Sequence, residues 1–152
     1  MRFTFSLTGT PIQADGIAFV IQTDGPWAIG RYGGDIGLVH LHGVASVIHT
    51  YINNHLGFTL DANPFDAKDA PTNLGKSSVI TGREYIDYDV VNHVLTMSGH
   101  IVVDGRHFEV NDRAEVDLAA LLGTDSATFG FTGGTGGLNS DQRITGWSIV
   151  TR

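Results

Sequence analysis

The chain has 152 residues, 20 glycines, no cysteine and a net charge of −7 from 9 Lys+Arg and 16 Asp+Glu. This length suits a single domain over residues 1–152 with a hydrophobic core of its own. Apolar runs such as Ile17 to Ile21 are far shorter than the roughly 20 residues that a bilayer requires, so we expect no membrane insertion. An acidic chain without a Lys/Arg cluster is a poor ligand for phosphate backbones, so we expect no nucleic-acid partner. The absence of cysteine excludes disulfides, thiolate metal sites and a cysteine nucleophile.

The first residues, Met1 to Leu7, alternate between polar and apolar side chains and predict a strand. They lack the basic and apolar segments of a secretory signal. The compartment therefore stays open: the protein is intracellular, or it is secreted or at the cell surface as part of a longer chain.

Further segments with the same period of two predict more strands, each with one buried face. They lie around residues 56–60, 84–89, 108–110, 127–131 and 145–149. An apolar segment at 101–103 precedes a turn signal. The pair Asp104-Gly105 predicts a tight hairpin, because both residues tolerate a positive φ. A single short helix is predicted between Asp117, as its N-cap, and Gly123, as its C-terminal stop.

Many short strands, abundant glycine and almost no helix indicate an all-β fold, a sandwich or jelly roll of two antiparallel sheets. Four large aromatic side chains fall on the apolar side of their strands and are expected in the core. They are Phe19, Phe129, Phe131 and Trp147.

Five blocks of sequence carry a family resemblance. Residues 14–22 read A-D-G-I-A-F-V-I-Q, and a glycine-rich loop follows at 29–37. The third block is a strand at 46–53, and the fourth is the segment I-D-Y-D at 86–89. The fifth block is the ending from 116 to 148, which contains G-F-T-G-G-T-G and I-T-G-W-S. In this order the blocks resemble the L-type (legume-type) lectins. The resemblance implies a concanavalin A-like jelly-roll sandwich that binds carbohydrate.

The chain departs from this family in length. L-type lectin domains are usually longer, and here the sequence begins at the strand that leads to A-D-G, so N-terminal strands are expected to be missing. A sheet edge left uncovered in this way invites pairing. We therefore expect a homo-oligomer, or pairing with another chain through the exposed edge.

The second departure is in the metal site of the family. The family strand V-E-F-D-T-x-x-N gives a Glu and an Asp to a calcium and transition-metal pair, and the resemblance places Val47 and His49 at these two positions. Calcium prefers about six to eight oxygen ligands, several of them carboxylates. We therefore expect no metal and no cofactor here. A neutral His49 that is hydrogen-bonded in place of the lost ligands is favoured over an imidazole site for zinc, nickel or copper, built from His49 and His55 or from His40 and His42.

The resemblance also implies the sugar-binding residues. In the family, the counterpart of Asp15 follows a cis peptide bond and accepts hydrogen bonds from two sugar hydroxyls. A backbone N–H of the glycine loop, an Asn and the loop before the last strand complete the pocket, and an aromatic ring contacts the sugar face. The predicted carbohydrate-binding residues are Asp15, Gly33, Gly34, Tyr51, Asn53, Gly134 and Leu138.

Each of these residues also has an ordinary structural interpretation. Asp15 is then a turn aspartate, Asn53 a strand-end amide, and the glycines belong to plain loops. Trp27 and Tyr32 are further candidates for the aromatic contact.

The sequence therefore predicts a lectin-like module that binds glycans or polysaccharide, with lost or weakened calcium dependence. The alternative is a structural or self-assembly module that keeps the fold without binding sugar. An enzyme is not expected, because the paired carboxylates of glycosidases are not found in a suitable motif. Asp87 and Asp89 share a strand face and are interpreted as solvated.

Overall fold

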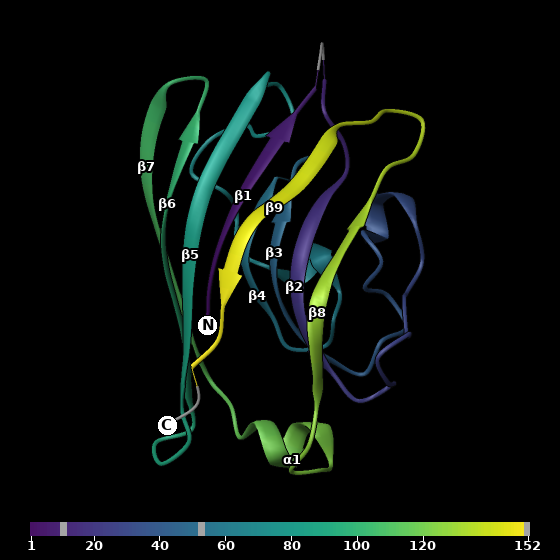
Figure 1. Ribbon diagram of the computed structural model, residues 1–152, viewed down its shortest axis with the longest axis vertical. Coiled ribbons are helices and arrows are strands. Elements are labelled where there is room, and N and C mark those ends of the chain that lie inside the picture. The colour runs from purple at the N-terminus through teal and green to yellow at the C-terminus, as the bar shows by residue number, and fades with distance from the viewer. Residues whose placement is uncertain (10–11, 52–53, 151–152) are drawn as a thin grey trace.

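Two antiparallel sheets face each other in the computed structural model, which describes residues 1–9, 12–51 and 54–150 (Figure 1). The five-stranded sheet runs in the order β7 (Arg106–Glu115), β6 (Val94–Val103), β5 (Val79–Asp89), β1 (Arg2–Thr8) and β9 (Asp141–Ser148). The four-stranded sheet runs in the order β4 (His55–Thr59), β3 (Gly43–His49), β2 (Gly16–Gln22) and β8 (Thr128–Gly134). The predicted all-β sandwich is confirmed.

The alternation of β1 explains how the main core forms. Phe3, Phe5 and Leu7 are all buried, while the residues between them face outward. They pack against inward side chains of both sheets, including Phe19 of β2 and Ile86 of β5. Because side chains in a strand alternate between its two faces, one apolar face per strand is enough to fill the space between the sheets.

The predicted turn and helix are also confirmed. Asp104 and Gly105 join β6 to β7 with φ values of 47° and 80°, both in the left-handed region that a primed turn needs. Helix α1 (Leu118–Leu122) begins after Asp117, whose carboxylate accepts from the Ala120 N–H at 3.0 Å, and ends at Gly123 with φ 70°. Of the residues described, none belongs to a helix that is long and apolar enough to span a bilayer.

Two of the expected core aromatics are not buried, and that part of the prediction is wrong. Phe19 is buried and Phe131 is partly buried, but Phe129 is 42% exposed and Trp147 58% exposed. Both face inward, since Phe129 pairs with Ile21 and Trp147 pairs with the buried Phe3. They remain exposed because β8 and β9 are the last strands of their sheets, and nothing in the described chain covers these two edges.

A second apolar cluster packs on the outer face of the four-stranded sheet and supports the loops there. In this cluster, apolar side chains from the loops pack against the side chains of β2 and β3 that point away from the five-stranded sheet. Its buried members are Ala18, Val20, Ile36, Leu38, Leu41, Ala45, Val47, Ala62 and Ala67. This cluster fixes the short turns η1 (Gly33–Asp35) and η2 (Pro64–Asp66) beside the ends of β2 and β3.

Candidate glycan-binding site

Five chain segments meet at one end of the four-stranded sheet and line a cavity of about 360 Å³. The turn η1 and the loop after β8 lie together at the upper right of Figure 1. The cavity is lined by Ala14, Asp15, Gly33, Gly34, His49, Tyr51, Phe65, Gly136, Gly137 and Leu138.

Most of the predicted site residues are brought together by this cavity. Asp15, Gly33, Gly34, Tyr51 and Leu138 all line it. Gly134 lies beside the cavity and does not line it, and Asn53 lies outside the described residues.

Asp15 is held in place by its main chain. Its N–H donates to the Gly134 carbonyl at 2.9 Å, and its carbonyl accepts from the Thr50 N–H at 2.8 Å. The peptide bond between Ala14 and Asp15 is cis, as the family resemblance implies. The Ala14 carbonyl accepts from the Ser140 hydroxyl at 3.1 Å. The position of the Asp15 side chain is therefore set by neighbouring strands and loops.

Among the described residues that line this cavity, Asp15 is the only one with a carboxylate. The residue is only 4% exposed, and burial raises the pKa of its carboxyl. In the described part of the chain, no group donates a hydrogen bond to that carboxylate. A buried carboxylate without protein donors, at the wall of a cavity, is suited to accept hydrogen bonds from a ligand.

Glycines allow the backbone to approach this carboxylate closely. A Cβ on Gly136 would lie 3.4 Å from Asp15 Oδ2, and one on Gly33 would lie 4.0 Å from it. Gly33 also has a φ of 65°, which favours glycine. Gly134 has a different role: a Cβ there would lie 2.5 Å from the Gly33 carbonyl, so it lets the two loops pack together.

His49 ties β3 to the glycine loop. Its Nε2 is 2.8 Å from the Gly34 carbonyl, and because a carbonyl can only accept, Nε2 carries the proton and Nδ1 does not. The ring is 1% exposed and lies edge-on to Phe65, with 5.1 Å between the ring centroids. Burial is the main reason why the pKa of His49 is lowered, so the neutral ring is favoured. This geometry agrees with the expected neutral, hydrogen-bonded histidine.

The donor groups around His49 do not fit calcium. Val47, at the position of the family's Glu, is fully buried in the apolar cluster. His49, at the position of the Asp, presents an imidazole that is already bonded to Gly34. His55 lies beside it, with Nδ1 3.6 Å from Asp69 Oδ1. Within residues 1–9, 12–51 and 54–150, no three His, Asp or Glu side chains gather closely enough to hold an ion.

Phe65 lines the cavity and was not indicated by the sequence, whereas Gly136 and Gly137 belong to the loop before the last strand that the resemblance implied. Phe65 reaches it because Asn63 caps η2 and Pro64 begins that turn, which places the ring against His49. Trp27 and Tyr32, proposed as aromatic contacts, are 94% and 88% exposed and do not line the cavity. His40 and His42 lie in a turn before β3, not on one face of a strand.

The two-sheet sandwich and the glycine loops around a buried aspartate agree with the L-type lectin class. The legume lectin domain model matches residues 1–152, and the chain belongs to that family. Members of this family are carbohydrate-binding proteins without enzymatic activity.

Solved lectins share the fold. A lectin from Bauhinia forficata in complex with GalNAc is 25% identical, with a TM-score of 0.68; the match covers 94% of this chain and 68% of that one. Lectin II from Ulex europaeus is 19% identical with a TM-score of 0.72, and the match covers 94% of this chain and 68% of that one. Arcelin-5, a lectin-like defense protein from Phaseolus vulgaris, is 19% identical with a TM-score of 0.71, and the coverages are 94% and 65%. The chain thus spans about two thirds of the length of these proteins.

Proposed function

We propose that this protein binds glycans through the cavity at Asp15 and does so without calcium. The observation that carries the proposal is the Asp15 carboxylate, which is buried, fixed by its main chain and free of donors from the described residues. Sugar hydroxyls are donors and acceptors at once, so two of them can donate to the two carboxylate oxygens.

The walls of the cavity suit the rest of a sugar ring. An amide of the Gly33-Gly34 turn can approach a ring oxygen because neither residue has a side chain in the way. Tyr51, Phe65 and Leu138 offer apolar surface to the C–H face of the ring. The GalNAc complex of the Bauhinia forficata lectin supports a glycan as the ligand class.

Independence from calcium is supported by the residues that replace the metal ligands. The hydrogen bond from His49 to Gly34 directly joins β3 to the loop that forms the cavity wall. The cavity is therefore held together by protein groups alone, and we expect calcium chelation to leave it intact.

A glycan array with fluorescently labelled protein tests both parts of the proposal. We expect a defined set of glycans to be bound equally in EDTA and in added calcium. Binding that disappears in EDTA contradicts the calcium-independent site. The absence of binding to any glycan in either buffer contradicts sugar recognition and favours the assembly module.

A further inference from the structure

The hairpin of β6 and β7, at one edge of the five-stranded sheet, carries two histidines whose rings meet. The register of the two strands places Val102 opposite His107, so His100 and His107 are diagonal neighbours on the outward face. Aromatic side chains at such diagonal positions are within reach of one another. His107 Nδ1 lies 3.1 Å from His100 Nε2, and the ring centroids are 5.1 Å apart.

The turn of this hairpin fixes the strands that present the two rings. The carboxylate of Asp104, in the turn, accepts from the Ser78 N–H at 3.0 Å and from the Val79 N–H at 2.9 Å. The turn is thereby tied to the start of β5, which is the next strand of the sheet. Ligands placed on strands are positioned more exactly than ligands on loops, so the two rings are held ready for a shared partner.

The separation of the two nitrogens suits one transition-metal ion between them. Imidazole nitrogens bind zinc at about 2.0–2.1 Å, so two of them on a tetrahedral ion lie about 3.3 Å apart. The observed 3.1 Å is close to this value. At that distance one ring donates its proton to the other, but a neutral imidazole can carry its proton on either nitrogen. When the donor ring moves the proton to its far nitrogen, both facing lone pairs are available to the metal.

The donor set selects the class of metal. Imidazole suits zinc, nickel and copper, whereas calcium and magnesium prefer oxygen ligands. Among the residues that the structure describes, no third His, Asp or Glu lies close enough to join the pair, so water completes the coordination. His107 is exposed and His100 is partly exposed, which gives the ion and the water access.

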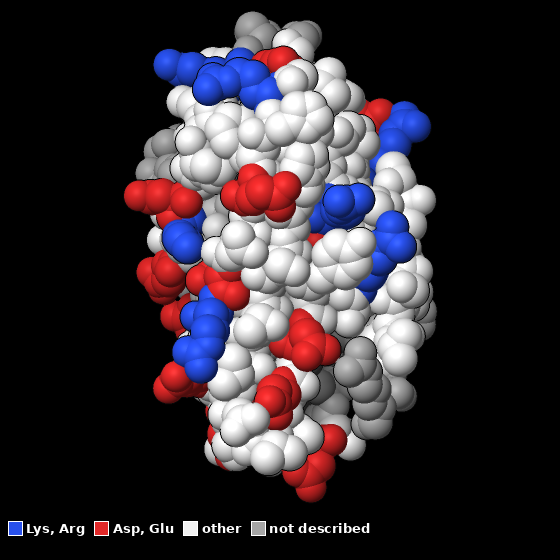
Figure 2. All heavy atoms as spheres, turned by 90° about the vertical axis from the view of Figure 1, so that its left-hand side faces the viewer, with Lys and Arg blue, Asp and Glu red and all other residues white. Residues whose placement is uncertain are grey.

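The charges around the pair do not oppose a cation. The protein has a net charge of −7, and Figure 2 shows acidic side chains over much of the side of the molecule on which β6 and β7 lie. In the sheet His100 stands between Glu109 and Arg83, whose charges offset each other. Arg106 points to the opposite face, where its guanidinium lies 5.4 Å from the centroid of the Phe108 ring.

We propose that His100 and His107 form a surface site for a divalent transition-metal ion of the zinc, nickel and copper class, and that the bound ion joins β6 to the edge strand β7. This site belongs to the five-stranded sheet, whereas the Asp15 cavity lies at the end of the four-stranded sheet. Metal binding and glycan binding can therefore be tested separately.

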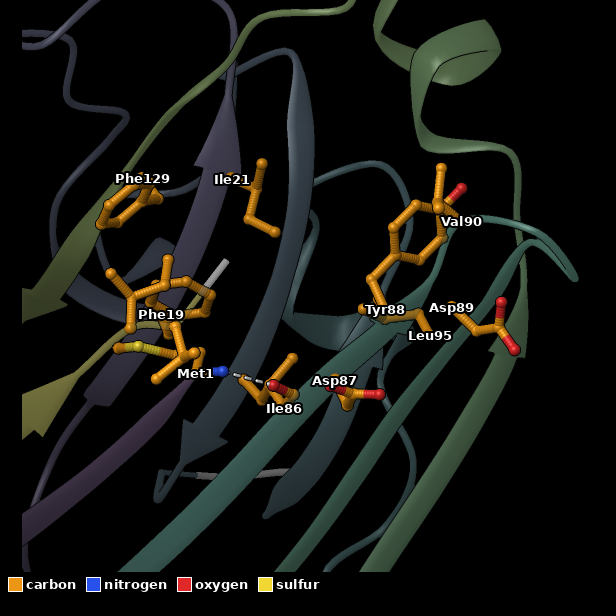
Figure 3. Close-up of a pocket in the computed structure, with 12 residues that line it drawn as sticks. Met1, Phe19, Ile21, Ile86, Asp87, Tyr88, Asp89, Val90, Leu95 and Phe129 are labelled. Atoms are coloured by element: carbon orange, nitrogen blue, oxygen red, sulfur yellow. Dashed lines mark hydrogen bonds between the residues drawn. The ribbon is translucent and has the colours of Figure 1, made fainter. Parts of the chain in front are cut away.

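Calorimetric titration of metal-stripped protein with zinc chloride tests the site. We expect the wild type to bind one zinc ion per chain, and His100→Gln and His107→Gln to bind it at least about tenfold more weakly, because each variant loses one of the two protein ligands. The matched control is His93→Gln, which should bind zinc like the wild type. His93 is also exposed, in the turn between β5 and β6, and its Nδ1 is 3.3 Å from the Tyr88 hydroxyl. Figure 3 shows Tyr88 beside the gap between the sheets, away from the histidine pair.

An anomalous difference map from crystals soaked in zinc locates the ion directly. We expect a peak between His100 Nε2 and His107 Nδ1, and no binding when calcium replaces zinc in the titration. Far-UV circular dichroism checks that each variant is folded. The proposal is overturned by a wild type that does not bind zinc, by undiminished binding in both His100→Gln and His107→Gln, by calcium binding as tight as that of zinc, or by zinc peaks only at other positions.

Discussion

The carboxyl group of Glu84 provides a direct test of how the core is packed. Glu84 is fully buried on the inner face of β5, between Phe3 of β1 and Gly99 of β6. One oxygen accepts from the Ser46 hydroxyl at 2.8 Å, and the other has no hydrogen-bond partner. Gly99 leaves room for it, because a Cβ there would lie 3.2 Å from Glu84 Cγ. Replacing Glu84 with glutamine keeps the shape and removes the titration.

Burial raises the pKa of Glu84 from 4.5 to about 7, partly offset by the Ser46 hydrogen bond. Between these two pH values the folded protein keeps a proton that the unfolded chain has lost. The stabilisation is therefore complete below the unfolded pKa of 4.5 and is lost as the pH rises to about 7. At about 1.4 kcal/mol per pH unit, this interval corresponds to roughly 3 kcal/mol of unfolding free energy.

Urea unfolding of the wild type and of Glu84→Gln, at a series of pH values from about 4 to about 8, measures this effect. We expect the wild type to lose roughly 3 kcal/mol relative to Glu84→Gln across that range. Glu109→Gln is the matched control, because Glu109 is exposed on β7, and it should follow the wild type. A difference between wild type and Glu84→Gln that is the same at every pH would refute the buried, protonated carboxyl.

Three further predictions concern the glycan site. Gly136→Val should block sugar binding with little change in melting temperature, because its side chain extends toward Asp15. Gly130→Val is the control, because Gly130 also has open space around its Cβ but does not line the cavity, and equal binding by both variants would contradict the cavity geometry. His49→Ala should lower the melting temperature, because leaving the Gly34 carbonyl unpaired costs about 1–3 kcal/mol of unfolding free energy. The same variant should also bind glycan more weakly. A variant that melts at the wild-type temperature would show that the hydrogen bond to Gly34 does not stabilise the fold. Calcium added to metal-stripped protein should leave the melting temperature unchanged, whereas a rise with calcium concentration would reveal a bound ion.

The sequence was sufficient for the sandwich and for much of the site, for identifiable reasons. The alternation of polar and apolar residues in segments such as Phe3 to Leu7 determines which side chains face the core. The Ala14-Asp15-Gly16 block indicates the binding loop through its resemblance to the family. Alternation correctly gave Trp147 an inward orientation, but it carries no information on whether a neighbouring strand covers the edge.

Long-range packing accounts for the residues that were missed. Phe65 enters the site only because η2 folds back onto His49, a contact that no local pattern encodes. Glu84 falls on the same face of its strand as Ile86, which was a usable signal for a buried carboxyl. Its burial nevertheless depends on space left by Gly99 on the adjacent strand, which sequence spacing does not reveal.

The central claim is that Asp15 binds a glycan without calcium, and calorimetric titration with the strongest glycan from the array tests it most directly. Wild-type protein, Asp15→Asn and Asp125→Asn are compared in EDTA, Asp125 being an exposed aspartate remote from the cavity lining. A hydrogen bond to a charged group is worth about 1.5–3 kcal/mol, so Asp15→Asn should bind at least about tenfold more weakly. The wild type and Asp125→Asn should bind equally. Undiminished binding by Asp15→Asn, or wild-type binding that appears only when calcium is restored, would contradict the claim.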